Sequence, residues 1–273
     1  VTDYPGTIGL RFNFINGGTS GLMSNVKIRK AISYSIDREE MIDAVYGRYN
    51  PAYSYVAPAI TFNGSSYRSQ VGEVIEDEYN EYVGDPDKIV ALFQEGLDEL
   101  GVETPIEDIT LTYLTSGSTT EVQAEREYIQ QSLEETLGLT VELSVAGDNS
   151  LFIADRNEGN YDFFLGGWYS DYNDPLDFLY TNYTDAYGMS FGGYSNTDYD
   201  ALADQLVGET DMDKRLDIYK QMEQILLLDD CAFAPIYYAT KQVLLQNWVK
   251  DYRTSSFGAS AEFIWTYIDG KNQ

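Results

Sequence analysis

The segment from Tyr161 to Pro175, YDFFLGGWYSDYNDP, brings aromatic rings, glycines and carboxylates close together in the chain. An apolar run leads into two glycines and Trp168, and Tyr169 and Asp171 follow. Pro175 ends any regular strand because it has no N–H to donate. A buried strand that ends in glycines, rings and a carboxylate presents a small charged recognition point from a rigid base. The segment therefore predicts a binding site for a cationic, partly apolar ligand.

The chain lacks the residues on which much hydrolytic chemistry depends. It contains no histidine, which excludes Ser-His-Asp and Cys-His catalysis and removes the commonest zinc ligand. The single cysteine, Cys231, lies in the apolar run CAFAPIYY and is expected to be a small buried hydrophobe. Ser24 and Lys27 have the spacing of a Ser-x-x-Lys site, but no Lys-Thr-Gly follows and Ser24 reads as a helix N-cap. We expect no enzymatic activity and no catalytic residue.

Carboxylates are the remaining route to catalysis or metal binding. Asp171, Asp174 and Asp177 could supply the pair of a glycosidase, but acids are so common here that a pair is expected by chance. Asp171, Asn173 and Asp177 offer oxygen ligands for calcium, but Pro175 breaks the EF-hand pattern. We therefore expect no metal site and no cofactor.

Composition limits the partners and the location. The 273 residues are 43% hydrophobic, enough for one large domain or two modest ones. The net charge of −28, from 45 acids and 17 bases, excludes nucleic acid and favours cationic partners. No apolar run approaches the roughly 18–20 residues that span a bilayer. The start, VTDYPGTIGL, has no signal-peptide pattern, so a leader would lie outside this chain unless the protein is cytosolic.

A regular alternation of strands and helices should position the site. Strands at 109–114, 139–145 and 161–168 alternate with helices at 120–137 and 151–157. This β-α-β-α-β succession predicts a parallel sheet with right-handed crossovers. Ligands of open α/β sheets bind beyond the carboxyl ends of the strands, where the residues after the third strand would lie.

The flanking segments complete the expected layout. Residues 50–84, rich in Pro, Tyr, Gly and Ser, should be a long, mostly irregular surface excursion. Asp85-Pro86 begins a helix that ends at Gly101. The other expected elements are a strand at 8–14, helices at 24–35, 198–207 and 213–228, a helix capped by Asp37, and strands at 234–238, 243–246 and 263–268.

Several blocks carry a resemblance to a known family. NVKIRKAISYSIDREEM resembles the signature helix of the peptide- and oligopeptide-binding proteins of bacterial ABC importers, Val-x-Val-Arg-x-Ala followed by Ala-Ile-Asp-Arg. PAYSYVAP, GDPDKIVALFQEGLDELG, LGLTVEL, YDFFLGGWYSDYNDPLDFL and FAPIYYATKQVLLQNWVKDY follow in the family's order. The chain is thus identified as a member of bacterial extracellular solute-binding protein family 5.

The resemblance implies an α/β fold of the type II periplasmic-binding-protein kind. The chain would form the C-terminal lobe of a two-lobed protein, with a mixed, largely parallel sheet. Residues 1–16 would be a strand and hinge that cross from the N-terminal lobe, which is missing here. Residues 17–246 would be the ligand-binding lobe, and residues 247–273 a return segment to the missing lobe.

The resemblance also implies a peptide site. In peptide-binding members the aspartate of Gly-Trp-x-x-Asp receives the peptide's α-amino group, and that position here is Asp171. Backbone groups around Gly167 and Tyr169 would pair with the peptide main chain. Trp168 is either a pocket wall or part of the core, and the side chain of Tyr169 is the better candidate for a wall.

Further positions match the family less completely. Tyr252 matches a tyrosine near the cleft, and Arg156 matches a basic position that can meet a peptide carboxylate, or is a surface arginine. Leu165 and Asn157 stand where an arginine and a histidine can occur, which leaves ligand length open. Arg11 replaces an acid of some relatives and would repel cationic ligand residues.

The resemblance implies a monomeric, non-enzymatic substrate-binding component of an ABC peptide importer. It would work outside the cytoplasmic membrane, as a cell-surface lipoprotein or in the periplasm, with a permease as partner. Any lipid anchor would lie outside this chain. The alternative is another solute, such as an oligosaccharide or a signalling peptide. The lack of histidine weighs against metal chelates and haem as ligands. The 24 tyrosines are compatible with a sugar ligand, whereas Asp171 favours a ligand that carries an amine.

Overall fold

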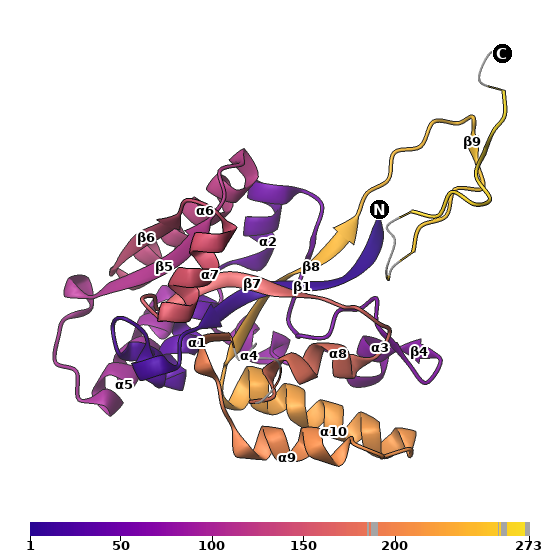
Figure 1. Cartoon of the computed structure of the whole chain (residues 1–273). Coiled ribbons are helices and arrows are strands. Elements are labelled where there is room, and N and C mark those ends of the chain that lie inside the picture. Colours follow the sequence, from indigo (N-terminus) through magenta and orange to yellow (C-terminus); the bar gives the residue numbers. More distant parts are fainter. Residues whose placement is uncertain (185, 187–190, 256, 258–260, 271–273) are drawn as a thin grey trace.

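A six-stranded mixed sheet forms the centre of the protein, with strand order β2-β8-β1-β7-β5-β6 (Figure 1). The computed structural model describes residues 1–184, 186, 191–255, 257 and 261–270. The strands are β1 Thr2–Phe12, β2 Asn50–Pro51, β3 Thr61–Phe62, β4 Ser65–Ser66, β5 Thr110–Ser116, β6 Thr140–Ala146, β7 Phe163–Tyr169, β8 Phe233–Lys241, β9 Val249–Lys250 and β10 Tyr267–Ile268. The α-helices are α1 Val26–Tyr34, α2 Arg38–Met41, α3 Tyr67–Val71, α4 Glu76–Tyr82, α5 Pro86–Leu100, α6 Thr120–Leu137, α7 Asn149–Glu158, α8 Pro175–Leu179, α9 Thr197–Gln205 and α10 Met212–Gln224.

The predicted β-α-β-α-β unit is confirmed as β5-α6-β6-α7-β7. β5 pairs in parallel with β6 on one side and β7 on the other. Asp85 caps α5, which has Pro86 in its first turn and ends at Gly101 in the left-handed conformation, as expected. The cap of α6 is Thr119, one residue before its first helical position, because its hydroxyl accepts from the Val122 N–H.

The first strand is part of this sheet and its core. β1 runs antiparallel between β7 and β8, and Leu10 and Phe12 are fully buried. Its partners lie far away in the sequence, which is why local pattern did not show them. The boundary at residue 16 therefore does not separate β1 from the lobe. That residues 1–16 also cross to a second lobe stays a prediction.

The two faces of the sheet carry separate cores. On one face, α1, α5 and α6 pack on the sheet with Leu10, Tyr113 and Ile236. On the other face, α8, α9 and α10 pack around Phe233 and Tyr238 of β8. α7 covers the same second face further along, where Phe152 packs on Leu114 and Phe164. The placement of α8 against α10 holds the chain that follows β7.

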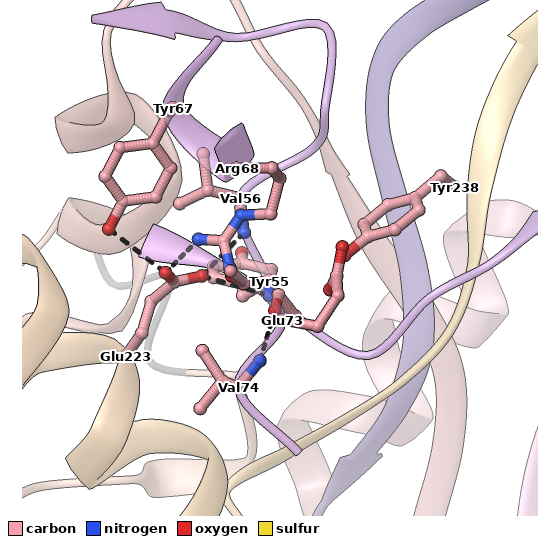
Figure 2. Close-up of polar contacts among 10 residues, drawn as sticks. Tyr55, Val56, Tyr67, Arg68, Glu73, Val74, Glu223 and Tyr238 are labelled. Carbon is pink, nitrogen blue, oxygen red and sulfur yellow. Dashed lines mark hydrogen bonds and ion pairs between the residues drawn. The ribbon is translucent and has the colours of Figure 1, made fainter. Parts of the chain in front are cut away.

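The prediction that residues 50–84 form a surface excursion is wrong. Many of their side chains are buried in the second core, including Tyr55 and Tyr67 at 0% exposure. Glu223 of α10, also fully buried, accepts from the N–H groups of Tyr55 and Val56 at 3.2 and 3.1 Å and from the Tyr67 hydroxyl at 3.0 Å. It also pairs with Arg68 (Figure 2). An irregular backbone can be buried here because a distant carboxylate satisfies its donors.

The arginines of the signature segment have structural roles. Asn25, not Ser24, caps α1 by accepting from the Lys27 and Ile28 N–H groups. Arg29 donates to the carbonyls of Met23, Asp230 and Cys231. Arg38, fully buried, donates to the carbonyls of Ala52 and Pro235. These bonds attach the α1–α2 segment to strand β8 and to the residues just before it.

The last part of the chain extends away from the sheet as a ribbon (Figure 1). The expected strand at 243–246 is absent there, and of 263–268 only β10 is a strand, paired with β9. The ribbon and the chain before it expose large apolar side chains: Leu244, Leu245, Phe263, Ile264, Trp265, Tyr267 and Ile268. No helix in the described part of the chain is long and apolar enough to cross a bilayer.

Candidate functional site

A cavity of about 540 Å³ lies beside the carboxyl end of β7. Its lining residues are Trp168, Asp171, Tyr172, Leu176, Asp177, Tyr180, Thr181 and Ala186. Tyr172 and Tyr180 are partly exposed, and Tyr180 stacks on Tyr183 with ring centroids 5.1 Å apart. The cavity thus has an aromatic and aliphatic wall and two carboxylates, and its size is that of a small-ligand site.

Asp177, in α8, holds the turn that carries Asp171. Its Oδ2 accepts three hydrogen bonds, from Trp168 Nε1 at 2.8 Å, Ser170 Oγ at 2.8 Å and the Asp171 N–H at 2.9 Å. The position of Asp177 is set by Asp174, which caps α8 by accepting from the Leu176 N–H, and by proline at the first helical position. The side chain of Asp171 remains exposed at the cavity.

One edge of β7 is open next to this cavity. Ser170 N–H donates to the Pro5 carbonyl at 2.7 Å, and Asn13 N–H donates to the Asp162 carbonyl at 2.9 Å. Because an antiparallel ladder alternates, the even-numbered residues of β7 bond to β1, and the N–H and C=O groups of the odd-numbered residues point to the other edge. The parallel bridge of Leu114 with Phe164 uses the Leu165 N–H, so residues 167 and 169 lie beyond the pairing with β5. β5 pairs with that edge only at positions 163 and 164 among the described residues. The open edge offers unpaired backbone groups to an extended chain.

Trp168 and Tyr169 point to opposite faces of the sheet, as successive strand residues must. Trp168 lines the cavity and also packs against the second core, so it belongs both to the cavity wall and to the core. Tyr169, 47% exposed, lies over Gly6 and lines a separate recess of about 240 Å³ with Tyr4, Tyr49 and Lys241. Tyr169 is therefore not a wall of the cavity that contains Asp171.

A titratable carboxylate lies behind the recess. Burial raises the pKa of Glu125 on α6 to about 7, against 4.5 for an ordinary glutamate. Its carboxylate accepts from the Tyr46 hydroxyl, and Tyr46 packs on Tyr49 and Tyr237. Since the folded protein holds this proton more tightly than the unfolded chain, the free energy of unfolding should fall as pH rises from about 4.5 to 7, by at most about 3 kcal/mol. Above that range this contribution is constant.

Glu125→Gln is expected to remove this part of the pH dependence. The amide oxygen can still accept from Tyr46 and carries no charge, so the variant should be more stable than the wild type near pH 8 and equal to it near pH 4.5. Urea unfolding at the two pH values measures the difference. An equal change at both values would contradict the assignment.

The structure does not bring all predicted site residues together. Gly167 lies in β7 with its backbone at the open edge, but Arg156 lies on α7 and lines neither cavity nor recess. Tyr252 packs on Phe263 in the ribbon, with centroids 5.7 Å apart. Arg11 is buried, and donates to Asn182 and to the Tyr55 hydroxyl. Ligand contacts of Arg156 and Tyr252, and repulsion of cations by Arg11, stay predictions.

The other acids of the segment have structural partners. Asp174 accepts from the Tyr219 hydroxyl and lies 3.8 Å from Arg215. Asn173 bonds to Thr61 through both its oxygen and its nitrogen. No three acidic or cysteine side chains converge as a metal site among the described residues. The described residues therefore show no cluster that would hold calcium.

A family model for the bacterial extracellular solute-binding proteins, family 5 (middle segment), matches residues 1–190. The chain belongs to this family. Among family 5 relatives, an oligopeptide-binding protein OppA of Bacillus subtilis is 31% identical over 237 residues, which are 84% of this chain and 39% of that protein. Listeria monocytogenes OppA bound to peptide superposes with a TM-score of 0.78 at 30% identity, over 98% of this chain and 49% of that one.

The fold is likewise that of one lobe of a type II periplasmic binding protein. The substrate-binding domain of an oligopeptide ABC transporter from Bacillus anthracis has a TM-score of 0.82 at 24% identity, and covers 98% of this chain but only 50% of its own. The chain therefore spans half or less of the length of these family 5 relatives.

Sequence reasoning missed the two residues that hold the site in place. Asp177 was considered only as a glycosidase or calcium candidate, and Glu223 was not considered. Asp177 follows Asp174 by three residues, at the start of a helix that begins with proline. This spacing could have shown that the first turn of α8 directs the Asp177 side chain toward Trp168. Nothing near Glu223 in the sequence indicates its partners, which lie more than 150 positions away.

Proposed function

We propose that this chain is the ligand-binding lobe of a substrate-binding component of an ABC peptide importer. Family membership supports the class of protein, and the relatives named above are oligopeptide-binding. The observation that carries the proposal is the open edge of β7, which ends at an exposed carboxylate beside a cavity. An extended peptide would add to this edge through its backbone, with its amino group at Asp171.

The chemistry of Asp171 suits a free amine. A charge-assisted bond between its carboxylate and an ammonium in a closed cleft contributes roughly 1.5–3 kcal/mol. The backbone pairing at positions 167 and 169 is independent of ligand side chains, so it gives affinity without sequence preference. The protein works outside the cytoplasmic membrane in this proposal, and closure of two lobes presents the liganded form to the permease.

The exposed apolar residues of the ribbon fit the same proposal. Such a patch is unusual for a surface that faces only water. The relatives are about twice as long as this chain, and residues 247–273 would pack on the lobe that their additional length forms.

Asp171→Asn is expected to weaken peptide binding roughly 10- to 150-fold in the full-length protein, since one charge-assisted bond is lost. Calorimetry with a mixed peptide pool, and with the same pool N-acetylated, measures the effect. Only the free-amine pool should bind the wild type tightly, and Asp108→Asn, an exposed change before β5, should bind like the wild type.

Equal binding of both pools would show that Asp171 does not anchor an amine. If neither pool binds, the peptide proposal fails. Oligosaccharides would then be tested first, because Tyr172 and Tyr180 offer aromatic faces in the cavity.

A further inference from the structure

One carboxylate oxygen at the cavity beside β7 accepts no hydrogen bond from the part of the chain that the structure describes. Asp177 is 7% exposed, and all three of its hydrogen bonds go to Oδ2. No described residue donates to Oδ1, although the side chain lines the cavity. Oδ1 is not one of the buried side-chain atoms left without a partner, so it is open to the cavity while most of the side chain is buried. The free oxygen thus marks a place for a donor that the protein does not supply.

The charge around the cavity is not balanced by the protein. Neither Asp171 nor Asp177 forms an ion pair with a lysine or arginine in the described part of the chain. The sequence contains no lysine or arginine from residue 157 to residue 213. The chain around the cavity therefore brings two negative charges and no positive one.

Arg11 reaches the cavity wall only through intervening side chains. The guanidinium of Arg11 donates to Asn182 Oδ1 at 2.8 Å and to the Tyr55 hydroxyl at 2.6 Å. The same hydroxyl lies 2.8 Å from Thr181 Oγ1, and Thr181 lines the cavity. Arg11 is thus one side-chain layer further from a ligand than Asp177, which lines the cavity directly.

We propose that Asp177 Oδ1 receives a cationic side chain of the ligand, so that this lobe selects peptides whose first residue is lysine or arginine. The inference rests on the proposed function and names its substrate class. With the α-amino group at Asp171, the side chain of the same residue can enter the adjoining cavity. Its methylene groups pack on Trp168, Tyr172 and Leu176, and its charged end meets Asp177. Two ligand cations then balance the two carboxylates.

The test compares two tripeptides in the full-length protein by calorimetry, Lys-Ala-Ala and norleucine-Ala-Ala. Both have a free amine and a linear apolar stem, and they differ in the terminal charge. The wild type is expected to bind the lysine peptide at least about tenfold more tightly. Equal affinities, or a preference for norleucine, would overturn the inference but leave the peptide proposal standing. Binding of neither peptide would overturn both.

Asp177→Asn provides the matched variant. Its amide oxygen can still accept from Trp168 Nε1 and the Asp171 N–H. Because Asp177 also holds the turn that carries Asp171, the affinity for both peptides is expected to fall, and the readout is the ratio of the two affinities. The preference for lysine should fall to about twofold or less. Retention of the full preference would overturn the inference, and so would an equal loss for both peptides, because Asp177 would then only position the turn. The wild-type comparison decides the question even if the variant does not fold.

Discussion

Glu223→Ala is expected to lower the free energy of unfolding by about 3–5 kcal/mol, which for many domains prevents folding. The substitution removes the only described ion-pair partner of the buried guanidinium of Arg68. It also leaves the N–H groups of Tyr55 and Val56 without their acceptor. Charged and polar groups buried without partners carry the full cost of their lost hydration, which explains the size of the effect.

Three comparisons separate charge from packing at Glu223. Glu223→Gln keeps an acceptor for the backbone and should be less destabilising than alanine. The double change Glu223→Met with Arg68→Met removes both charges and should recover part of the loss. Glu127→Ala, on the exposed side of α6, should change stability by no more than about 0.5 kcal/mol. Urea unfolding followed by tyrosine fluorescence measures all four, and a loss below about 1 kcal/mol in Glu223→Ala would refute the structural role.

The same network bears on ligand binding. Glu223 accepts from the Tyr55 N–H (Figure 2). The Tyr55 hydroxyl lies 2.8 Å from Thr181 Oγ1 in the cavity wall. A variant that still folds, such as Glu223→Gln, should therefore bind peptide more weakly than the wild type although the substituted residue lies outside the cavity.

Gly167→Ala is expected to destabilise the protein by about 1–3 kcal/mol and to weaken peptide binding with it. A Cβ atom at this position would lie 1.9 Å from the Thr7 carbonyl oxygen and 2.8 Å from Ile8 Cα. Both are backbone atoms of β1, so the two strands must move apart rather than one side chain turn away. That movement would displace the open edge of β7 on which the proposed peptide pairing depends.

Gly147→Ala is the matched control for this change. A Cβ there would meet Leu151 Cδ1 at 3.4 Å, an ordinary contact, so stability and binding should stay close to those of the wild type. Thermal unfolding and calorimetry of both variants test the pair. If Gly167→Ala were as stable as Gly147→Ala, the close approach of β1 and β7 would not be a constraint.

Local signals in the sequence determined the longer helices, the parallel unit and the place of the site. The cap at Asp85, the stop at Gly101 and the alternation of 109–169 depend on neighbouring residues, and the structure has them at or within two residues of their expected positions. The same locality put Trp168 and Asp171 at the carboxyl end of a strand, where they line one cavity.

Only the tertiary structure decided which residues hold that site. β1 lies beside β7 although more than 150 residues separate them. Part of segment 50–84 is buried, where Glu223 of α10 accepts from the N–H groups of Tyr55 and Val56. Tyr169 turned away from the cavity because successive strand residues face opposite sides. Periodicity and helix caps arise from contacts between residues that are close in the sequence. Strand order and the pairing of buried polar groups depend instead on which distant groups can form hydrogen bonds with one another. A single sequence does not show that pairing.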